Sequence, residues 1–303
     1  MSNNEPPLSE CPEPIAIIGM GMPANPFPTI FIHVPLKLTE KKGCRWPGDV
    51  STPSQLWDLL IDKRSGYSDF PPDRVNAEGF YHPSRDRPGT FYTKGGYFLS
   101  GDVNQFDHGL FGISPMETRT LDPAQRKLME VTFEAFESAG EPWHKFSGSN
   151  TGVFVGNFNA DHQIMTVRDA DHSLPYATTG SDPAILSNRV NYVFNLLGPS
   201  ETVNTACSSS MYALHHAVSA LRAGDCERAI VAGTNIILDP ATQIFTTKLG
   251  AISPTSTCHT FDSAADGYAR ADGFGALYIM KLSDAVEGLY PIRAVIRGTA
   301  INA

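Results

Sequence analysis

Short apolar segments of strand length alternate along this chain with longer segments whose apolar residues recur at helical spacing. We expect strands at 15–20, 151–156, 201–206, 228–234, 274–282 and 292–300, and helices at 52–66, 121–140, 182–196 and 208–223. Strands that alternate with helices in this way predict an α/β fold, in which helices cover the faces of a central sheet.

Capping residues set the ends of two of these helices. Thr52 is a predicted N-cap, with Pro53 at the first helical position, where its missing N–H costs nothing. Asp122 is the predicted N-cap of the longest helix, Gln125 completes a pattern similar to a capping box, and Gly140 ends that helix.

Charge and hydropathy exclude several classes of protein. The formal net charge is −9, so the chain lacks the basic footprint of a nucleic-acid-binding protein. No apolar run approaches the roughly 20 residues that span a bilayer. Residues 1–13 are polar and rich in proline, and we expect a disordered lead there, without the pattern of a signal peptide. These features predict a cytoplasmic protein that binds neither nucleic acid nor membranes.

The five cysteines, at positions 11, 44, 207, 226 and 258, do not form a metal or disulfide pattern. Their number is odd and no two are spaced as C-x-x-C, which favours a reducing compartment and argues against a zinc site. The glycines and aspartates of 262–275 match neither a dinucleotide fingerprint nor a calcium loop. We therefore expect no bound cofactor and no metal.

Cys207 has a distinctive position, between the strand-like "ETVN" and the helix-like "SSSMYALHHAVSALRAG". At a helix start, unpaired N–H groups and the positive end of the helix dipole favour a thiolate over a thiol. The apolar and small residues that follow predict a largely buried helix, which would hold the sulfur rigidly. Most lone cysteines are inert and buried, so position alone leaves a nucleophile and a structural residue equally open.

Several segments together resemble the β-ketoacyl synthase family, and within it the ketosynthase domain of fungal reducing-type iterative polyketide synthases. They follow in the order of that family and are "EPIAIIGMG", "CRWPGDVSTPSQLWDLL", "FDHGLFGISPMETRTLDPAQRKLMEVTFEAFESAG", "TGVFVG", "GPSETVNTACSSSMYALHHA" and "TFDSAADGYARADGFGALYIMKL". The resemblance covers nearly everything from residue 14 to residue 303.

The resemblance implies a thiolase-like fold, layered α-β-α-β-α, of which this chain is the N-terminal half only, and a homodimer. It implies that Cys207 takes an acyl group as a thioester, for decarboxylative Claisen condensation with a malonyl unit. Both substrates arrive on the phosphopantetheine of an acyl carrier protein. The backbone N–H of Cys207 is an expected oxyanion donor, and Ser208, Phe261 and Asp262 have supporting roles.

Two departures from the family pattern bear on activity. Asn204 stands where the family usually has Asp, a change that the chemistry tolerates. The two histidines that assist decarboxylation, in "HGTG" and "NIGH" contexts, are absent, and His215 and His216 are expected to be structural. We therefore expect no condensation by this chain alone. A thiolate-dependent acyltransferase or hydrolase, or a non-enzymatic fragment, remain as alternatives.

A third departure is the segment 21–42, "GMPANPFPTIFIHVPLKLTEKK". Without these 22 residues, "IAIIGM" joins "GCRWPGDV" as in the family. Their four prolines and the apolar "TIFIHV" are unusual for a surface loop. Codons for Gly21-Met22 and Lys42-Gly43 accommodate the GT and AG of an intron, so our hypothesis is a retained intron. The alternative is an ordinary inserted loop, which surfaces tolerate well.

Overall fold

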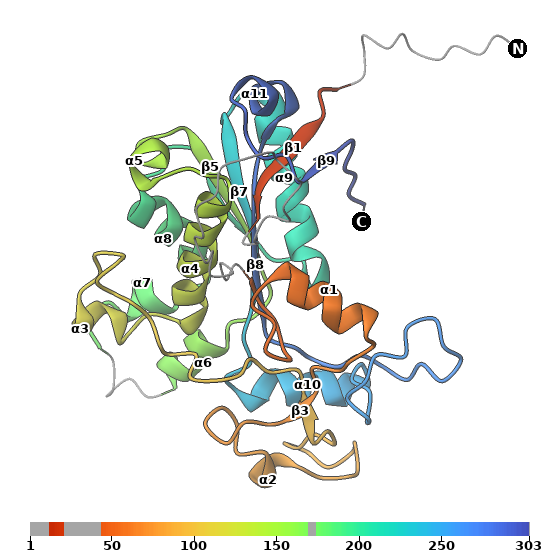
Figure 1. Cartoon of the computed structure of the whole chain (residues 1–303). Helices are drawn as coiled ribbons and strands as arrows, with labels where there is room; N and C mark the ends of the chain where they lie inside the picture. Colours follow the sequence, from red (N-terminus) through yellow and green to blue (C-terminus); the bar gives the residue numbers. More distant parts are fainter. Residues whose placement is uncertain (1–11, 21–43, 169–173, 303) are drawn as a thin grey trace, which may run out of the picture.

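The computed structural model describes residues 12–20, 44–168 and 174–302 and centres on one mixed sheet (Figure 1). Its strands are β1 (Ile15–Met20), β2 (Cys44–Arg45), β5 (Thr151–Asn157), β6 (Ser200–Val203), β7 (Arg228–Asn235), β8 (Gly273–Lys281) and β9 (Ala294–Ile296). A separate ribbon pairs β3 (Ser68–Asp69) with β4 (Gly95–Gly96). Most of the predicted disordered lead, and the segment 21–42, lie outside the described residues.

The helices are α1 (Pro53–Ile61), α2 (Ala77–Phe80), α3 (Pro115–Thr118), α4 (Pro123–Ser138), α5 (Trp143–Phe146), α6 (Asp161–Val167), α7 (Ala177–Ser181), α8 (Ile185–Phe194), α9 (Ser209–Ala223), α10 (Pro240–Leu249) and α11 (Leu282–Glu287). A single 3₁₀ turn, Ala206–Ser208, precedes α9.

The strands of the sheet follow the order β6-β5-β7-β8-β1-β9, and β2 also pairs with β8. Strands β6, β5 and β7 run parallel, whereas β8 is antiparallel to β7 and to β1. The carboxyl ends of the three parallel strands therefore meet at one edge of the sheet, where α/β proteins place their ligands.

Each face of the sheet is covered by helices, as Figure 1 shows. On one face, α4 and α8 bury a core that is rich in aromatic rings, with Phe136 stacked on Phe146 at 3.9 Å between ring centroids. On the other face, α9 packs its small residues against β5, β6, β7 and β8. Helices thus cover both faces of the sheet and exclude water from it, which confirms the predicted α/β fold.

The helix ends show where local signals were sufficient. The capping box at the start of α1 forms, because the Thr52 hydroxyl accepts from the Gln55 N–H and Gln55 bonds back to the Thr52 N–H. The corresponding prediction for Gln125 is wrong. Its side-chain oxygen accepts from the Arg189 guanidinium at 3.2 Å rather than from the Asp122 N–H, and its amide donates to the Thr179 and Gly180 carbonyls, both at 3.0 Å. Residues that are distant in the sequence thus bind the Gln125 side chain that the local pattern assigned to the helix cap.

Asp122 caps α4 as predicted, with its carboxylate oxygen 2.7 Å from the Ala124 nitrogen. The residue is 8% exposed, and desolvation raises the pKa of its carboxyl group to about 7. The Ala124 N–H and the Arg126 guanidinium both lower this pKa but do not offset burial. The folded protein therefore holds a proton on Asp122 over a pH range in which an unfolded chain has lost it.

We predict that Asp122→Asn flattens the pH dependence of stability between about pH 4 and pH 7. In the native protein the folded state binds more protons in this range, so the free energy of unfolding falls as pH rises, by at most about 1.4 kcal/mol per pH unit. Asparagine keeps an oxygen for the cap but does not titrate. Urea unfolding across this range measures the slope, and Asp107→Asn, an exposed residue that also accepts a main-chain N–H, is the control. Equal slopes for native protein and Asp122→Asn would contradict the prediction.

Candidate functional site

Cys207 lies in the 3₁₀ turn between β6 and α9, with its side chain exposed. The predicted placement at a strand-to-helix junction is confirmed, although the strand ends at Val203 rather than at residue 206. The preceding Ala206 has a φ of 56°, in the left-handed region. A non-glycine residue there costs of order 1 kcal/mol, so the surrounding contacts must hold it in place.

Side-chain oxygens from the neighbouring residues hold this turn. The Asn204 Oδ1 accepts from the Ala206 N–H at 3.1 Å. The Ser209 hydroxyl accepts from the Thr205 N–H at 2.9 Å and donates to the Ala206 carbonyl at 2.6 Å. The Ser208 hydroxyl donates to the Thr205 carbonyl at 2.8 Å. An aspartate oxygen would accept from Ala206 equally well, which explains why Asn204 is compatible with the site.

Two glycines allow the first turn of α9 to rest directly on the sheet. A Cβ atom on Gly156 of β5 would lie 2.3 Å from the Ser210 nitrogen, and one on Gly233 of β7 would lie 3.2 Å from the Ser210 Cβ. The first of these distances is shorter than any real contact, and its partner is backbone. The position of Cys207 is therefore set by contacts to two central strands as well as by its own loop.

The rest of α9 anchors the turn through buried small residues. Ala213, Ala217, Val218 and Leu221 are buried between the helix and the sheet. Met211 is 62% exposed, so the alanine-rich side of α9 is the one that faces the core. This close packing makes the helix a rigid support for the turn.

The Cys207 backbone N–H has no hydrogen-bond acceptor within the parts of the chain that the structure describes. It lies in the 3₁₀ turn that leads into α9, before any intrahelical bond to it is possible. An exposed sulfur and an unpaired N–H thus belong to the same residue at the start of a buried helix.

The other described cysteines lie in different environments. Cys44 and Cys226 are buried, and desolvation raises the pKa of each thiol to about 11. Their thiolates are therefore scarce at neutral pH, as expected for structural residues. Cys258 is exposed, and its sulfur accepts from the Ala269 N–H at 3.3 Å.

The remaining predicted site residues have no hydrogen bond to the Cys207 turn among the described residues. Phe261 is fully exposed with a φ of 65°, and Asp262 accepts from the Ala264 N–H within its own turn. Their loop extends from the body of the protein at the lower right of Figure 1. His215 bonds the Thr299 hydroxyl at 2.9 Å. Its neighbour His216 bonds the Glu201 carboxylate at 3.0 Å.

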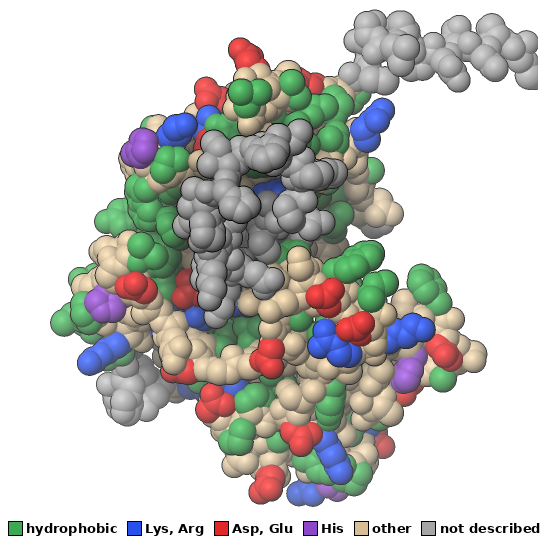
Figure 2. Space-filling view, viewed as in Figure 1, with side chains coloured by type: hydrophobic (Ala, Val, Ile, Leu, Met, Phe, Trp, Pro, Cys, Tyr) green, Lys and Arg blue, Asp and Glu red, His purple; other side chains and the backbone are tan. Residues whose placement is uncertain are grey.

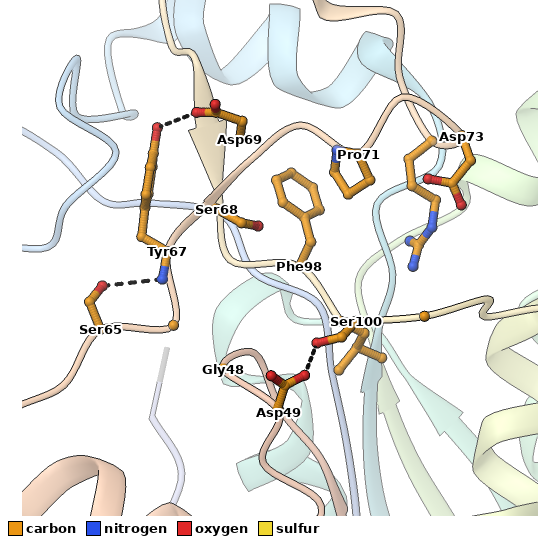
Figure 3. Close-up of a pocket in the computed structure, with 14 residues that line it drawn as sticks. Gly48, Asp49, Ser65, Tyr67, Ser68, Asp69, Pro71, Asp73, Phe98 and Ser100 are labelled. Atoms are coloured by element: carbon orange, nitrogen blue, oxygen red, sulfur yellow. Dashed lines mark hydrogen bonds between the residues drawn. The ribbon is translucent and has the colours of Figure 1, made fainter.

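A polar cavity of about 510 Å³ lies elsewhere, among the loops that contain β3 and β4, and Cys207 does not line it. Of its three aspartates, Asp49 accepts from the Ser100 hydroxyl and Asp69 from the Tyr67 hydroxyl at 3.4 Å, whereas no hydrogen bond from Asp73 to the other lining residues is drawn (Figure 3). On the face drawn in Figure 2, acidic and basic side chains are intermingled in its lower half. The net negative charge is thus not gathered into one patch on that face.

Comparisons with known sequences point to one family. The family model described as "Beta-ketoacyl synthase, N-terminal domain" matches residues 42–285. Prosolanapyrone synthase of Alternaria solani is 57% identical over 292 residues, which cover 96% of this chain and 10% of that protein. A highly reducing polyketide synthase of Pyrenophora dematioidea is 54% identical and covered to 11%. The chain thus spans about a tenth of the length of these relatives.

Solved structures agree with the sequences. The oxazolomycin ketosynthase domain of Streptomyces albus superposes with a TM-score of 0.83 at 33% identity, over 96% of this chain and 47% of that one. The ketosynthase from module 6 of the bacillaene synthase of Bacillus subtilis gives a TM-score of 0.76 at 28% identity, over 93% and 42%. The fold is therefore thiolase-like, as predicted, and this chain matches just under half of each solved domain.

We predict that Gly156→Ala displaces the first turn of α9 and lowers the free energy of unfolding by roughly 1–3 kcal/mol, the usual cost of overpacking. The new Cβ would meet backbone, which has little freedom to move. Urea unfolding measures the effect. Gly79→Ala in α2 is the matched control, because its Cβ would find its nearest neighbour at 3.7 Å. Equal midpoints for the two variants would contradict the prediction.

Proposed function

The chain belongs to the β-ketoacyl synthase family, and we propose that it carries the acyl-accepting nucleophile of a polyketide ketosynthase at Cys207. One observation carries the proposal: Cys207 is exposed and its own N–H has no acceptor among the described residues, in a turn fixed to the start of a buried helix. Fungal highly reducing polyketide synthases are the relatives that support the choice of substrate.

The first step is a transfer of one acyl group between two sulfurs. The Cys207 thiolate attacks the carbonyl carbon of an acyl group that is held as a thioester on the phosphopantetheine of a carrier protein. The carbon–sulfur bond to phosphopantetheine breaks, and the released thiolate takes up the proton that Cys207 gave up. Thiolates are good nucleophiles and good leaving groups, so the acyl-enzyme forms readily and remains reactive.

The unpaired Cys207 N–H supplies charge stabilisation in this step. Negative charge develops on the carbonyl oxygen as the tetrahedral intermediate forms, and a main-chain N–H fixed in advance stabilises it without reorganisation. The hydroxyls of Ser208 and Ser209 are engaged with the backbone of the same turn. We assign them to holding the geometry rather than to contact with the substrate.

Condensation requires groups beyond those near Cys207. A malonyl unit on the carrier protein would lose carbon dioxide, and its carbanion would attack the acyl-Cys207 thioester and release the thiolate. Both described histidines of α9 bond to other residues, His215 to Thr299 and His216 to Glu201. We therefore propose that this chain accepts acyl groups but does not condense them. We also propose that it pairs with a second copy of itself and receives its acyl group from the carrier protein.

We predict that hexanoyl-N-acetylcysteamine, a thioester that mimics acyl-phosphopantetheine, acylates Cys207 and that Cys207→Ala lowers the label at least tenfold. Intact-protein mass spectrometry with peptide mapping measures the adduct. Cys258→Ala is the control, because it removes the other described cysteine that is exposed.

The outcomes separate the alternatives. An acylated Cys207 that gives no β-ketoacyl product with malonyl-N-acetylcysteamine supports the proposal. Free hexanoic acid released by Cys207 without a lasting adduct indicates a hydrolase. If neither an adduct nor a product depends on Cys207, the chain is a non-enzymatic fragment. That result contradicts the proposal.

A further inference from the structure

Strands β1 and β2 pair with the same edge of β8, one after the other. Met20, the last residue of β1, is opposite Leu277, and Cys44, the first residue of β2, is opposite Gly275. Leu277 and Gly275 are two positions apart on β8, with Ala276 between them. The two strands therefore occupy consecutive stretches of a single antiparallel ladder, each with β8 as its partner.

The register leaves room for one residue between the two strands. The β1–β8 register shifts once, between Ile17 and Gly19. From Gly19 onward it pairs residue for residue, so a single position, opposite Ala276, lies between Met20 and Cys44. The chain has 23 residues there, numbered 21–43. Its excess of 22 equals the length of the segment 21–42 that interrupts the resemblance to the family.

Contacts to α4 show the same continuity. A Cβ on Gly19 of β1 would lie 2.2 Å from the Ala135 carbonyl oxygen, so β1 rests directly on that helix. Arg45 of β2 forms a part-buried ion pair with Glu134, at 2.8 Å between Nη2 and Oε1. The ends of β1 and β2 thus contact neighbouring residues of α4, Ala135 and Glu134.

Trp46 gives β2 a second attachment. Its ring covers Gly273 and Gly275 of β8, where added Cβ atoms would lie 2.5 Å and 3.4 Å from ring carbons. Cys44 itself is 5% exposed. The residues after the long segment are therefore as firmly placed as those before it.

We infer that β1 and β2 are two halves of one strand and that residues 21–42 are an insertion into its middle, which the fold does not require. Natural insertions concentrate in surface loops, whereas this one interrupts a strand where the ladder needs a single residue. The match to the family model begins at residue 42, where the segment ends. Gly21-Met22 and Lys42-Gly43 can be encoded with a GT donor and an AG acceptor, so we assign the segment to an unspliced intron.

Three deletions test the register in the full chain. Deleting 21–42 leaves one residue between Met20 and Cys44, whereas deleting 21–41 or 21–43 leaves two or none. Because side chains alternate between the faces of a sheet, a shift of one residue would turn Cys44 and Arg45 to the wrong sides. We expect the first deletion to melt no lower than the full chain, and each of the other two to melt at least about 5 °C below it.

Equal melting of the three deletions, or a lower melting temperature for the 21–42 deletion than for the full chain, would overturn the inference. Amplification of the source transcript across codons 20 to 44 tests the intron separately and does not depend on folding. An amplified product that is shorter by 22 codons supports the intron. If every transcript retains these codons, the segment is not an intron. Neither result depends on the function proposed for Cys207.

Discussion

The candidate site depends on how closely the first turn of α9 approaches the sheet. Gly156 and Gly233 remove the side chains that would otherwise separate Ser210 from β5 and β7. That contact fixes the start of α9, and the helix start in turn leaves the Cys207 N–H without a partner among the described residues. Sulfur, donor and rigid support therefore come from one packing arrangement, which links the core to the proposed chemistry.

Local signals in the sequence were enough for the framework. Proline after a capping residue marked the starts of α1 and α4, because a cap involves only residues within one turn of each other. The same Asp-Pro signal precedes α10, at Asp239, where no long periodic segment marks the helix. Cys207 was correctly placed between strand and helix for the same local reason.

Contacts between distant segments could not be predicted in this way. Nothing near Gly156 in the sequence indicates that it meets Ser210, and nothing near Gln125 indicates that the loop at Thr179 takes its side chain. Ser208 was predicted only as a supporting residue and Ser209 was not a predicted site residue, whereas the bonds of both hydroxyls to the turn emerge from the three-dimensional arrangement. The resemblance to the family rested on several motifs in a fixed order. Cys207 alone could not have indicated it.

The most direct test of this account compares the alkylation rates of Cys207 and Cys258 by iodoacetamide at pH 7, measured by peptide mapping of the folded chain. Both sulfurs are exposed, but only Cys207 lies at the start of a buried helix beside its own free N–H. We predict that Cys207 reacts at least tenfold faster than Cys258, and that urea abolishes the difference. Equal rates in the folded chain would show that the turn does not activate Cys207, and would contradict the account.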